Sequence, residues 1–107
     1  MRQIAPAQLA ARLASSDAEA PLLLDVREPW EFSHCHIDGS LLMPMASVPA
    51  RLTELDPQRE TVVICHHGGR SAHVCMFLER QGFSAVINLA GGVAGWARDV
   101  DPAMPQY

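Results

Sequence analysis

One segment constrains the fold of this chain more than any other, because a strand-like run passes directly into a glycine-containing loop and then into a helix-like run. Residues 61–65 are β-branched or apolar, as in a buried strand. The loop 66–70 follows at once, and residues 71–81 carry apolar side chains at helical spacing before Gly82, which suits a C-terminal cap. A strand, a short loop and a helix in this order are typical of α/β proteins.

The same alternation of strand-like and helix-like runs extends over the rest of the chain. We expect further strands at 22–26, 41–45 and 85–89, short helices at 7–13, 30–34, 48–55 and 93–98, a polar loop at 15–21 and an irregular tail at 101–107. A chain of 107 residues can bury one hydrophobic core. We therefore expect a single α/β domain over residues 1–107.

Composition and charge argue against several classes of partner. Eight Lys and Arg residues against twelve Asp and Glu give a net charge of -4, and the chain has no basic run that could follow a phosphate backbone. Its longest apolar runs, 20–24 and 62–65, are far shorter than the roughly 20 residues of a membrane-spanning helix. The N-terminus shows no export signal, and three cysteines without a C-x-x-C pair suit a reducing compartment. We expect a cytoplasmic protein that binds neither nucleic acid nor membranes.

Cys65 is the candidate nucleophile because it ends the clearest strand, directly before the loop. Backbone N–H groups of the loop and the start of the following helix can converge on its sulfur and favour the thiolate. Gly68 and Gly69 allow the curvature that such a loop needs, and Arg70 offers a permanent positive charge to an anionic substrate. The alternative is that Cys65 is a small buried residue at a strand end. A Gly-Gly-Arg segment has little packing purpose there, so the nucleophile is favoured.

Four ordered motifs surround this cysteine and extend over nearly the whole chain. The segment CHHGGRS (65–71) is preceded by DVREPWEFSHCHIDGS (25–40) and followed by NLAGGVAGW (88–96). Together they resemble the rhodanese-like sulfurtransferase family, whose motifs are Asp-x-Arg, Glu-x4-His-Ile-x-Gly, Cys-x-x-Gly-x-Arg and Gly-Gly-x3-Trp. The matching positions are Asp25, Arg27, Glu31, His36, Ile37, Gly39, Cys65, Gly68, Arg70, Gly91, Gly92 and Trp96.

The resemblance implies a mostly parallel five-stranded sheet flanked by helices, with a transferable sulfane sulfur carried by Cys65 as a persulfide. The donor would be a small anionic sulfur compound such as thiosulfate, or another persulfide, and the acceptor would be cyanide, a thiol or a protein. Neither a cofactor nor a metal ion is expected. The residues expected to bind the donor are His66, His67, Gly68, Gly69, Arg70 and Ser71.

Three other functions compete with sulfur transfer from small donors. Members of the related fold that act as phosphatases or arsenate reductases usually carry Cys-x5-Arg, whereas residues 65–70 read Cys-x4-Arg. The shorter loop is expected to fit a sulfur atom rather than a tetrahedral oxyanion. A non-catalytic binding module of the family would often lack the cysteine. A carrier that takes sulfur from a dedicated protein donor stays open.

Several side chains near these motifs have a structural interpretation. Ser71 is placed to cap the following helix, although it could also donate to a bound anion. Cys35 could act as a resolving thiol, but a small residue in a tight loop is favoured, and Cys75 is expected to be inert in the core. Trp96 is expected to pack under the active-site loop. For Asp25, Arg27, Glu31 and His36 we expect charge-assisted hydrogen bonds that hold loops in place.

Overall fold

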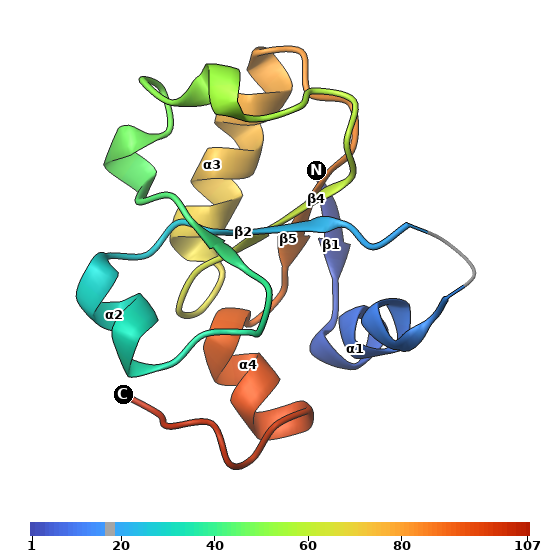
Figure 1. Ribbon diagram of the computed structural model, residues 1–107, viewed down its shortest axis with the longest axis vertical. Coiled ribbons are helices and arrows are strands. Elements are labelled where there is room, and N and C mark those ends of the chain that lie inside the picture. The colour runs from blue at the N-terminus through green and yellow to red at the C-terminus, as the bar shows by residue number, and fades with distance from the viewer. Residues whose placement is uncertain (17–18) are drawn as a thin grey trace.

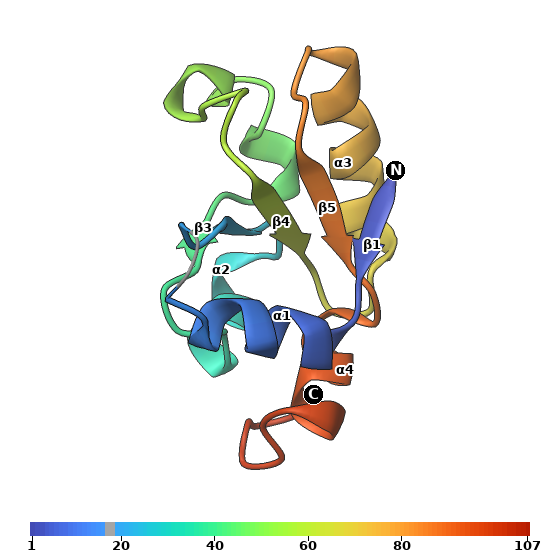
Figure 2. The ribbon, with the colours of Figure 1, turned by 90° about the vertical axis from the view of Figure 1, so that its right-hand side faces the viewer.

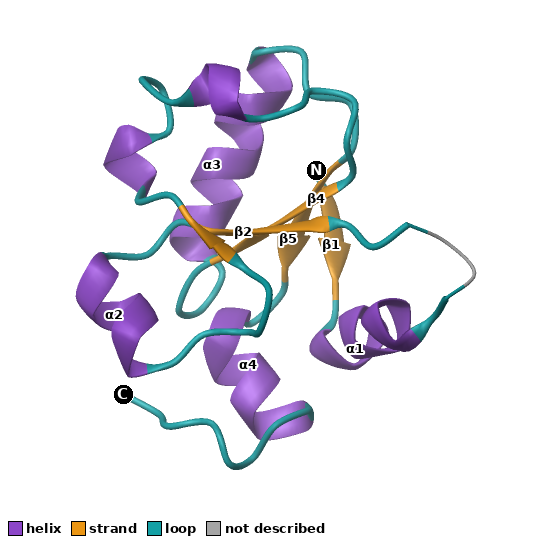
Figure 3. Cartoon of the chain, in the orientation of Figure 1, coloured by secondary structure: helices purple, strands orange, loops and turns teal. Residues whose placement is uncertain are grey.

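A computed structural model describes residues 1–16 and 19–107 and has an α/β architecture, with helices packed around a central sheet (Figure 1). Every strand pair in the sheet is parallel, and the strand order is β1-β5-β4-β2-β3. The strands are β1 (Arg2–Ile4), β2 (Leu22–Asp25), β3 (Leu41–Leu42), β4 (Thr61–Ile64) and β5 (Val86–Leu89). The helices are α1 (Pro6–Ala14), α2 (Pro29–His34), α3 (Gly69–Arg80) and α4 (Gly92–Asp99), as Figure 3 distinguishes by colour. The expected five-stranded parallel sheet is confirmed.

The central strand β4 is buried on both faces, which explains its nearly continuous apolar sequence. Val62 and Ile64 point into a core that α1 and α4 cover, whereas Val63 and Cys65 point into a second core against α3. Because side chains alternate along a strand, one β-branched run supplies both cores. Figure 2 shows β4, β5 and β1 side by side, with α3 beyond them and α1 and α4 near the ends of these strands.

Two predicted elements differ from the structure. The helix expected at 48–55 is wrong: this region contains two short 3-10 turns, Met45–Ser47 and Leu52–Glu54, separated by turn residues 48–51. Pro49 would lie in the first turn of such a helix, where proline is tolerated. The backbone bonds that follow, from Glu54 to Arg51 and from Leu55 to Leu52, instead close three residues back, as in a 3-10 turn. The strand expected at 41–45 ends after Leu42, before Pro44.

Strand β1 was not predicted, because its three residues are mostly polar and exposed and carry no strand pattern. It pairs with β5 as an edge strand, with Ile4 opposite Leu89. The predicted polar loop at 15–21 includes residues 17–18, which lie outside the described residues. The tail at 101–107 is irregular, as expected.

Candidate active site

Cys65 follows the last residue of β4, at the edge of the sheet where the carboxyl ends of the parallel strands meet. Ligands and reactive groups gather at this edge in open α/β sheets. The side chain is only 1% exposed. Its sulfur accepts a hydrogen bond from the Gly68 N–H at 3.0 Å and lies 3.3 Å from the Ser71 hydroxyl oxygen. The loop therefore closes back over the sulfur.

The first two peptide groups of the loop are anchored by the start of α4. The Val93 N–H donates to the Cys65 carbonyl at 2.9 Å, and the Ala94 N–H donates to the His66 carbonyl at 3.1 Å. In a trans peptide the N–H points opposite to the carbonyl. The N–H groups of these two peptides, which belong to His66 and His67, therefore face away from α4. The Cys65 side chain also lies on that side of the sheet, against α3. Such N–H groups can stabilise negative charge on a sulfur.

Two glycines make this loop geometry possible. Gly68 is the N-cap of α3, and its φ of +109° lies in the left-handed region that favours glycine. A Cβ on Gly92 would lie 2.3 Å from the Cys65 carbonyl oxygen. Only glycine therefore allows α4 to approach the loop closely enough to hold its carbonyl groups.

Ser71 does not cap α3, contrary to the prediction. The N-cap is Gly68, with no side-chain cap, and Ser71 lies within the first turn with its side chain fully buried. Its hydroxyl donates to the Asn88 side-chain oxygen at 2.5 Å, and Asn88 comes from the neighbouring strand β5. The role of Asn88 was not predictable from the sequence, because its position in an apolar strand gives no sign of a polar partner 17 residues away.

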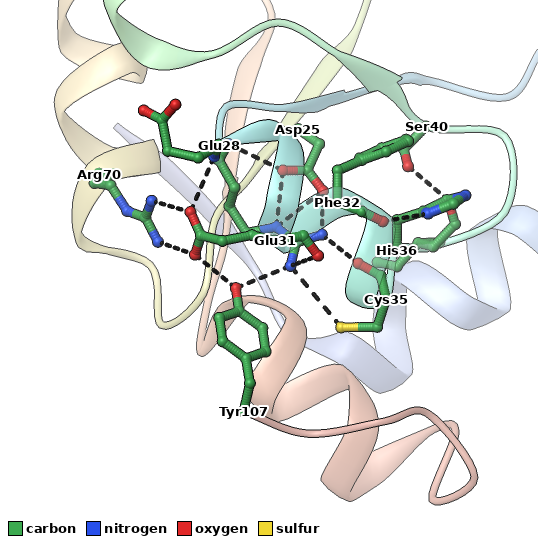
Figure 4. A network of polar contacts seen from close by, with 11 residues as sticks. Asp25, Glu28, Glu31, Phe32, Cys35, His36, Ser40, Arg70 and Tyr107 are labelled. Atoms are coloured by element: carbon green, nitrogen blue, oxygen red, sulfur yellow. Dashed lines mark hydrogen bonds and ion pairs between the residues drawn. The ribbon is translucent and has the colours of Figure 1, made fainter.

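The predicted donor-binding residue Arg70 faces a carboxylate. Its guanidinium donates two hydrogen bonds to Glu31 of α2, at 2.7 and 2.8 Å, and its side chain is 35% exposed (Figure 4). This bidentate ion pair raises the pKa of Arg70 above its ordinary value. Arg70 therefore stays charged, but a carboxylate already occupies two of its five N–H donors.

A second arginine lies next to this pair and is completely buried. Arg27 donates to both carboxylate oxygens of Asp25, to the Cys35 carbonyl at 2.7 Å and to the Tyr107 hydroxyl at 2.9 Å. Burial alone would lower the pKa of Arg27, but the hydrogen bonds to Asp25 and Tyr107 outweigh it and raise the pKa. The buried pair is fully hydrogen-bonded, as the predicted structural role of the Asp-x-Arg motif requires.

Tyr107 joins the two arginine-carboxylate pairs. Its hydroxyl donates to Glu31 at 2.7 Å while it accepts from Arg27, and Figure 4 shows the ring reaching up from the tail to this point. The bonds from Arg70, helped by the Glu28 backbone N–H and Tyr107 and opposed by burial, lower the pKa of Glu31 to about 2. Burial raises the pKa of Tyr107 to about 12. Tyr107 lies in the irregular tail, so no local pattern predicted its role.

The two loop histidines continue this cluster as a stack of rings. His66 stacks on Tyr107 with ring centres 3.9 Å apart, and His67 stacks on His66 at 4.0 Å. Burial lowers the pKa of His66, and the neighbouring His67 lowers it further. The rings border a hollow of about 90 Å³, lined by Cys35, His66, His67, Val93, Ala94, Ala97, Pro105, Gln106 and Tyr107.

The other two cysteines lie in different surroundings from Cys65. Cys35 is buried at the end of α2 and lines the hollow, with its sulfur 3.9 Å from an Arg27 nitrogen. Its side chain belongs to the core under α4, on the opposite face of the sheet from Cys65. Cys75 is fully buried in α3, and burial raises the pKa of its thiol to about 12. Cys75 is therefore a poor nucleophile, as predicted.

Within the described ranges 1–16 and 19–107, no three His, Cys, Asp or Glu side chains come together as metal ligands would. The helices of the same ranges include none with the length and apolar character needed to cross a membrane.

The chain shares its sequence pattern with a known family of proteins. Residues 5–99 match the Rhodanese-like domain family, and the chain belongs to that family. It is 39% identical over 98 residues to a sulfurtransferase of Allochromatium vinosum, covering 92% of this chain and 90% of that protein. It is 32% identical over 100 residues to the thiosulfate sulfurtransferase GlpE of Glaesserella parasuis, covering 94% and 90%. Other relatives are longer, and the chain spans only 22% to 30% of their length.

The fold matches solved structures of the same class. A rhodanese-related protein from Thermoplasma volcanium superimposes with a TM-score of 0.83 at 30% identity, covering 94% of each chain. The family and the names of its relatives support sulfur transfer as the general chemistry of this chain.

Proposed function

We propose that this protein moves sulfane sulfur from thiosulfate or a persulfide donor to a thiophilic acceptor through a persulfide on Cys65. The observation that carries the proposal is the cysteine sulfur at the carboxyl edge of the sheet, inside a loop whose Gly68 N–H already points at it from 3.0 Å. Fixed N–H donors around a sulfur stabilise an anion there without reorganisation.

The reaction proceeds in two displacements. The Cys65 thiolate attacks the outer sulfur of thiosulfate, a new S–S bond forms, and the old bond breaks with its electron pair leaving on sulfite. The acceptor, cyanide or a thiolate, then attacks the outer sulfur of the persulfide, and Cys65 leaves as a thiolate. No electrons are gained or lost overall, and ping-pong kinetics are expected. We place His66, His67, Gly68, Gly69, Arg70 and Ser71 around the donor as binding residues.

The test is intact-mass spectrometry under non-reducing conditions. After thiosulfate or a persulfide donor, the wild-type protein is expected to gain the mass of one sulfur atom and to lose it on addition of cyanide. Cys65→Ser is expected to gain nothing, whereas Cys75→Ser is expected to keep the gain because the Cys75 thiol is buried and burial raises its pKa. No gain with either donor would reject the proposal and leave a binding module.

A protein-to-protein sulfur carrier is the second candidate, because the positive charges near the loop are already neutralised. Arg70 is paired with Glu31, and Arg27 is paired with Asp25. A dianion such as thiosulfate would have to compete with a carboxylate for Arg70, whereas a protein-bound persulfide needs less positive charge. Equal or better use of thiosulfate than of a protein persulfide would count against the carrier.

The role of Arg70 in donor binding is separately testable. Arg70→Ala is expected to reduce kcat/KM for thiosulfate about tenfold or more, the scale of one charge-assisted interaction. Activity with an uncharged persulfide donor is expected to change less. Equal losses with both donors would mean that Arg70 acts only through its ion pair with Glu31.

A further inference from the structure

The orientation of the Asn88 side chain is fixed by its partners. One end of its amide lies 3.2 Å from the Gly68 carbonyl oxygen, which can only accept a hydrogen bond. That end is therefore the NH₂ group, which also donates to Gln3 at 3.2 Å. The other end, facing Ser71 at 2.5 Å, is the amide oxygen, which can only accept.

This orientation determines the direction of every hydrogen bond that reaches the Cys65 sulfur. A serine hydroxyl has one proton, and Ser71 donates that proton to Asn88. The Ser71 oxygen therefore faces the sulfur, 3.3 Å away, with its lone pairs. A hydrogen bond across this contact requires the Cys65 thiol to be the donor, and a thiolate would face lone pairs. The sulfur thus accepts one bond from Gly68 and donates one to Ser71.

We propose that Asn88 is a positioning residue that sets the ionisation of Cys65 by holding the Ser71 hydroxyl proton away from the sulfur. With Asn88 in place, Ser71 favours the protonated thiol. Removal of the Asn88 oxygen frees the Ser71 hydroxyl to turn and donate to the thiolate. The loop N–H groups and the start of α3 are expected to favour the thiolate, and Asn88 of β5 acts in the opposite direction. The inference bears on sulfur transfer only if Cys65 carries the sulfur, as proposed above.

Other ionisable groups around Cys65 are the same in the variants that test this. Arg70 lies at the start of α3 with its charge balanced by Glu31 of α2, and His66 and His67 belong to the loop itself. Cys75, one turn further along α3, stays protonated because burial raises its pKa. A change confined to Asn88 and Ser71 leaves all of these charges in place.

The test follows the rate of iodoacetamide alkylation of Cys65 against pH, with the modified peptide identified by mass spectrometry. Asn88→Leu is expected to lower the pH midpoint by about one unit, since a hydrogen bond to a charged group is worth roughly a tenfold change or more. In a Ser71→Ala background, Asn88→Leu is expected to have no further effect on the midpoint. Ser84→Ala removes an exposed hydroxyl far from the loop and is the control for substitution itself.

An unchanged or raised midpoint in Asn88→Leu would overturn the proposal, and so would an equal shift in the Ser71→Ala background. The direction of the bond can also be tested without substituting Asn88. The infrared S–H stretching band that disappears in Cys65→Ser is expected at lower frequency in the wild type than in Ser71→Ala, because only the wild-type thiol has Ser71 as an acceptor. Equal frequencies would contradict it. Both measurements report on the thiol and need no sulfur transfer, so a failure of the proposed function would be seen separately.

Discussion

Individual side chains in this site do more than one task, and Tyr107 is the clearest case. Its hydroxyl accepts from Arg27 and donates to Glu31, while its ring stacks on His66. One phenol thus connects the buried motif residues to the loop that holds Cys65. The sequence could not reveal this, because Tyr107 and Glu31 are 76 positions apart.

The hydroxyl and the ring of Tyr107 can be separated by substitution. Tyr107→Phe is expected to lower the free energy of unfolding by about 1–2 kcal/mol, because Glu31 loses a donor and Arg27 loses an acceptor in a part-buried place. Tyr107→Leu is expected to lose more, since it also removes the stacking on His66. Urea denaturation of both variants measures the difference, and a Tyr107→Phe protein as stable as the wild type would show that water replaces the hydroxyl at no cost.

At the scale of elements, the site depends on the contact between the loop after β4 and the start of α4. The helix holds the loop carbonyl groups through the Val93 and Ala94 N–H groups, and Gly92 lets it come close. A segment that contains no reacting atom therefore fixes the shape of the loop. Displacements of about 1 Å in such a support can reduce rates by two orders of magnitude.

Gly92→Ala is expected to reduce kcat for sulfur transfer by tenfold to a hundredfold, because the new Cβ would lie 2.3 Å from the Cys65 carbonyl oxygen and push α4 off the loop. The matched control is Gly39→Ala, which has the same kind of positive φ, +83°, but no atom within 4 Å of the added Cβ. It is expected to lose some stability and keep its kcat. Steady-state kinetics on both variants, with circular dichroism to confirm folding, decide this. Equal kcat losses would show that strain, rather than the contact, is responsible.

The elements that could be predicted from the sequence are those with strong local patterns. The predicted bounds of the strand 61–64, of the loop and of the helix after it agree with the structure to within two residues. Strand burial and helical spacing can be recognised from neighbouring residues alone. Strand β1 was missed, because only pairing with β5 makes it a strand. The positions of Cys65 after this strand and of Gly68 before this helix were predictable for the same local reason. Asn88 and Tyr107 were missed, because their roles arise from contacts between distant segments.

At the scale of the whole molecule, the ion pair between Glu31 and Arg70 couples α2 to α3 across the edge of the sheet. The Glu31 side chain is 5% exposed, so its negative charge depends on Arg70, Tyr107 and the Glu28 N–H. The exposed pair Arg51–Glu54 has the same bidentate geometry within one turn. Exposed pairs of that kind contribute little to stability.

Acid stability is expected to depend on Glu31. Its pKa is about 2 in the folded protein and near 4.5 ordinarily, so its contribution is present above pH 4.5 and is lost as the pH falls toward 2. The contribution is on the order of 2–3 kcal/mol. Glu31→Gln is expected to be less stable at neutral pH and to lose less stability between pH 4.5 and 2. Glu54→Gln is expected to follow the wild-type curve. Urea midpoints across this range test both, and parallel curves for Glu31→Gln and wild type would refute the assignment.

The aromatic contacts of Tyr107 also give the protein an optical reporter of its own site. Of the two tryptophans, Trp96 is buried in the core, whereas Trp30 is 64% exposed with its ring centre 5.6 Å from that of Tyr107. The emission of Trp30 is therefore expected to respond to the position of the Tyr107 ring, which stacks on His66 of the loop after β4. We expect donor binding or the proposed persulfide formation to change the intrinsic fluorescence wherever it moves the loop, and such a change could be followed in real time without a label.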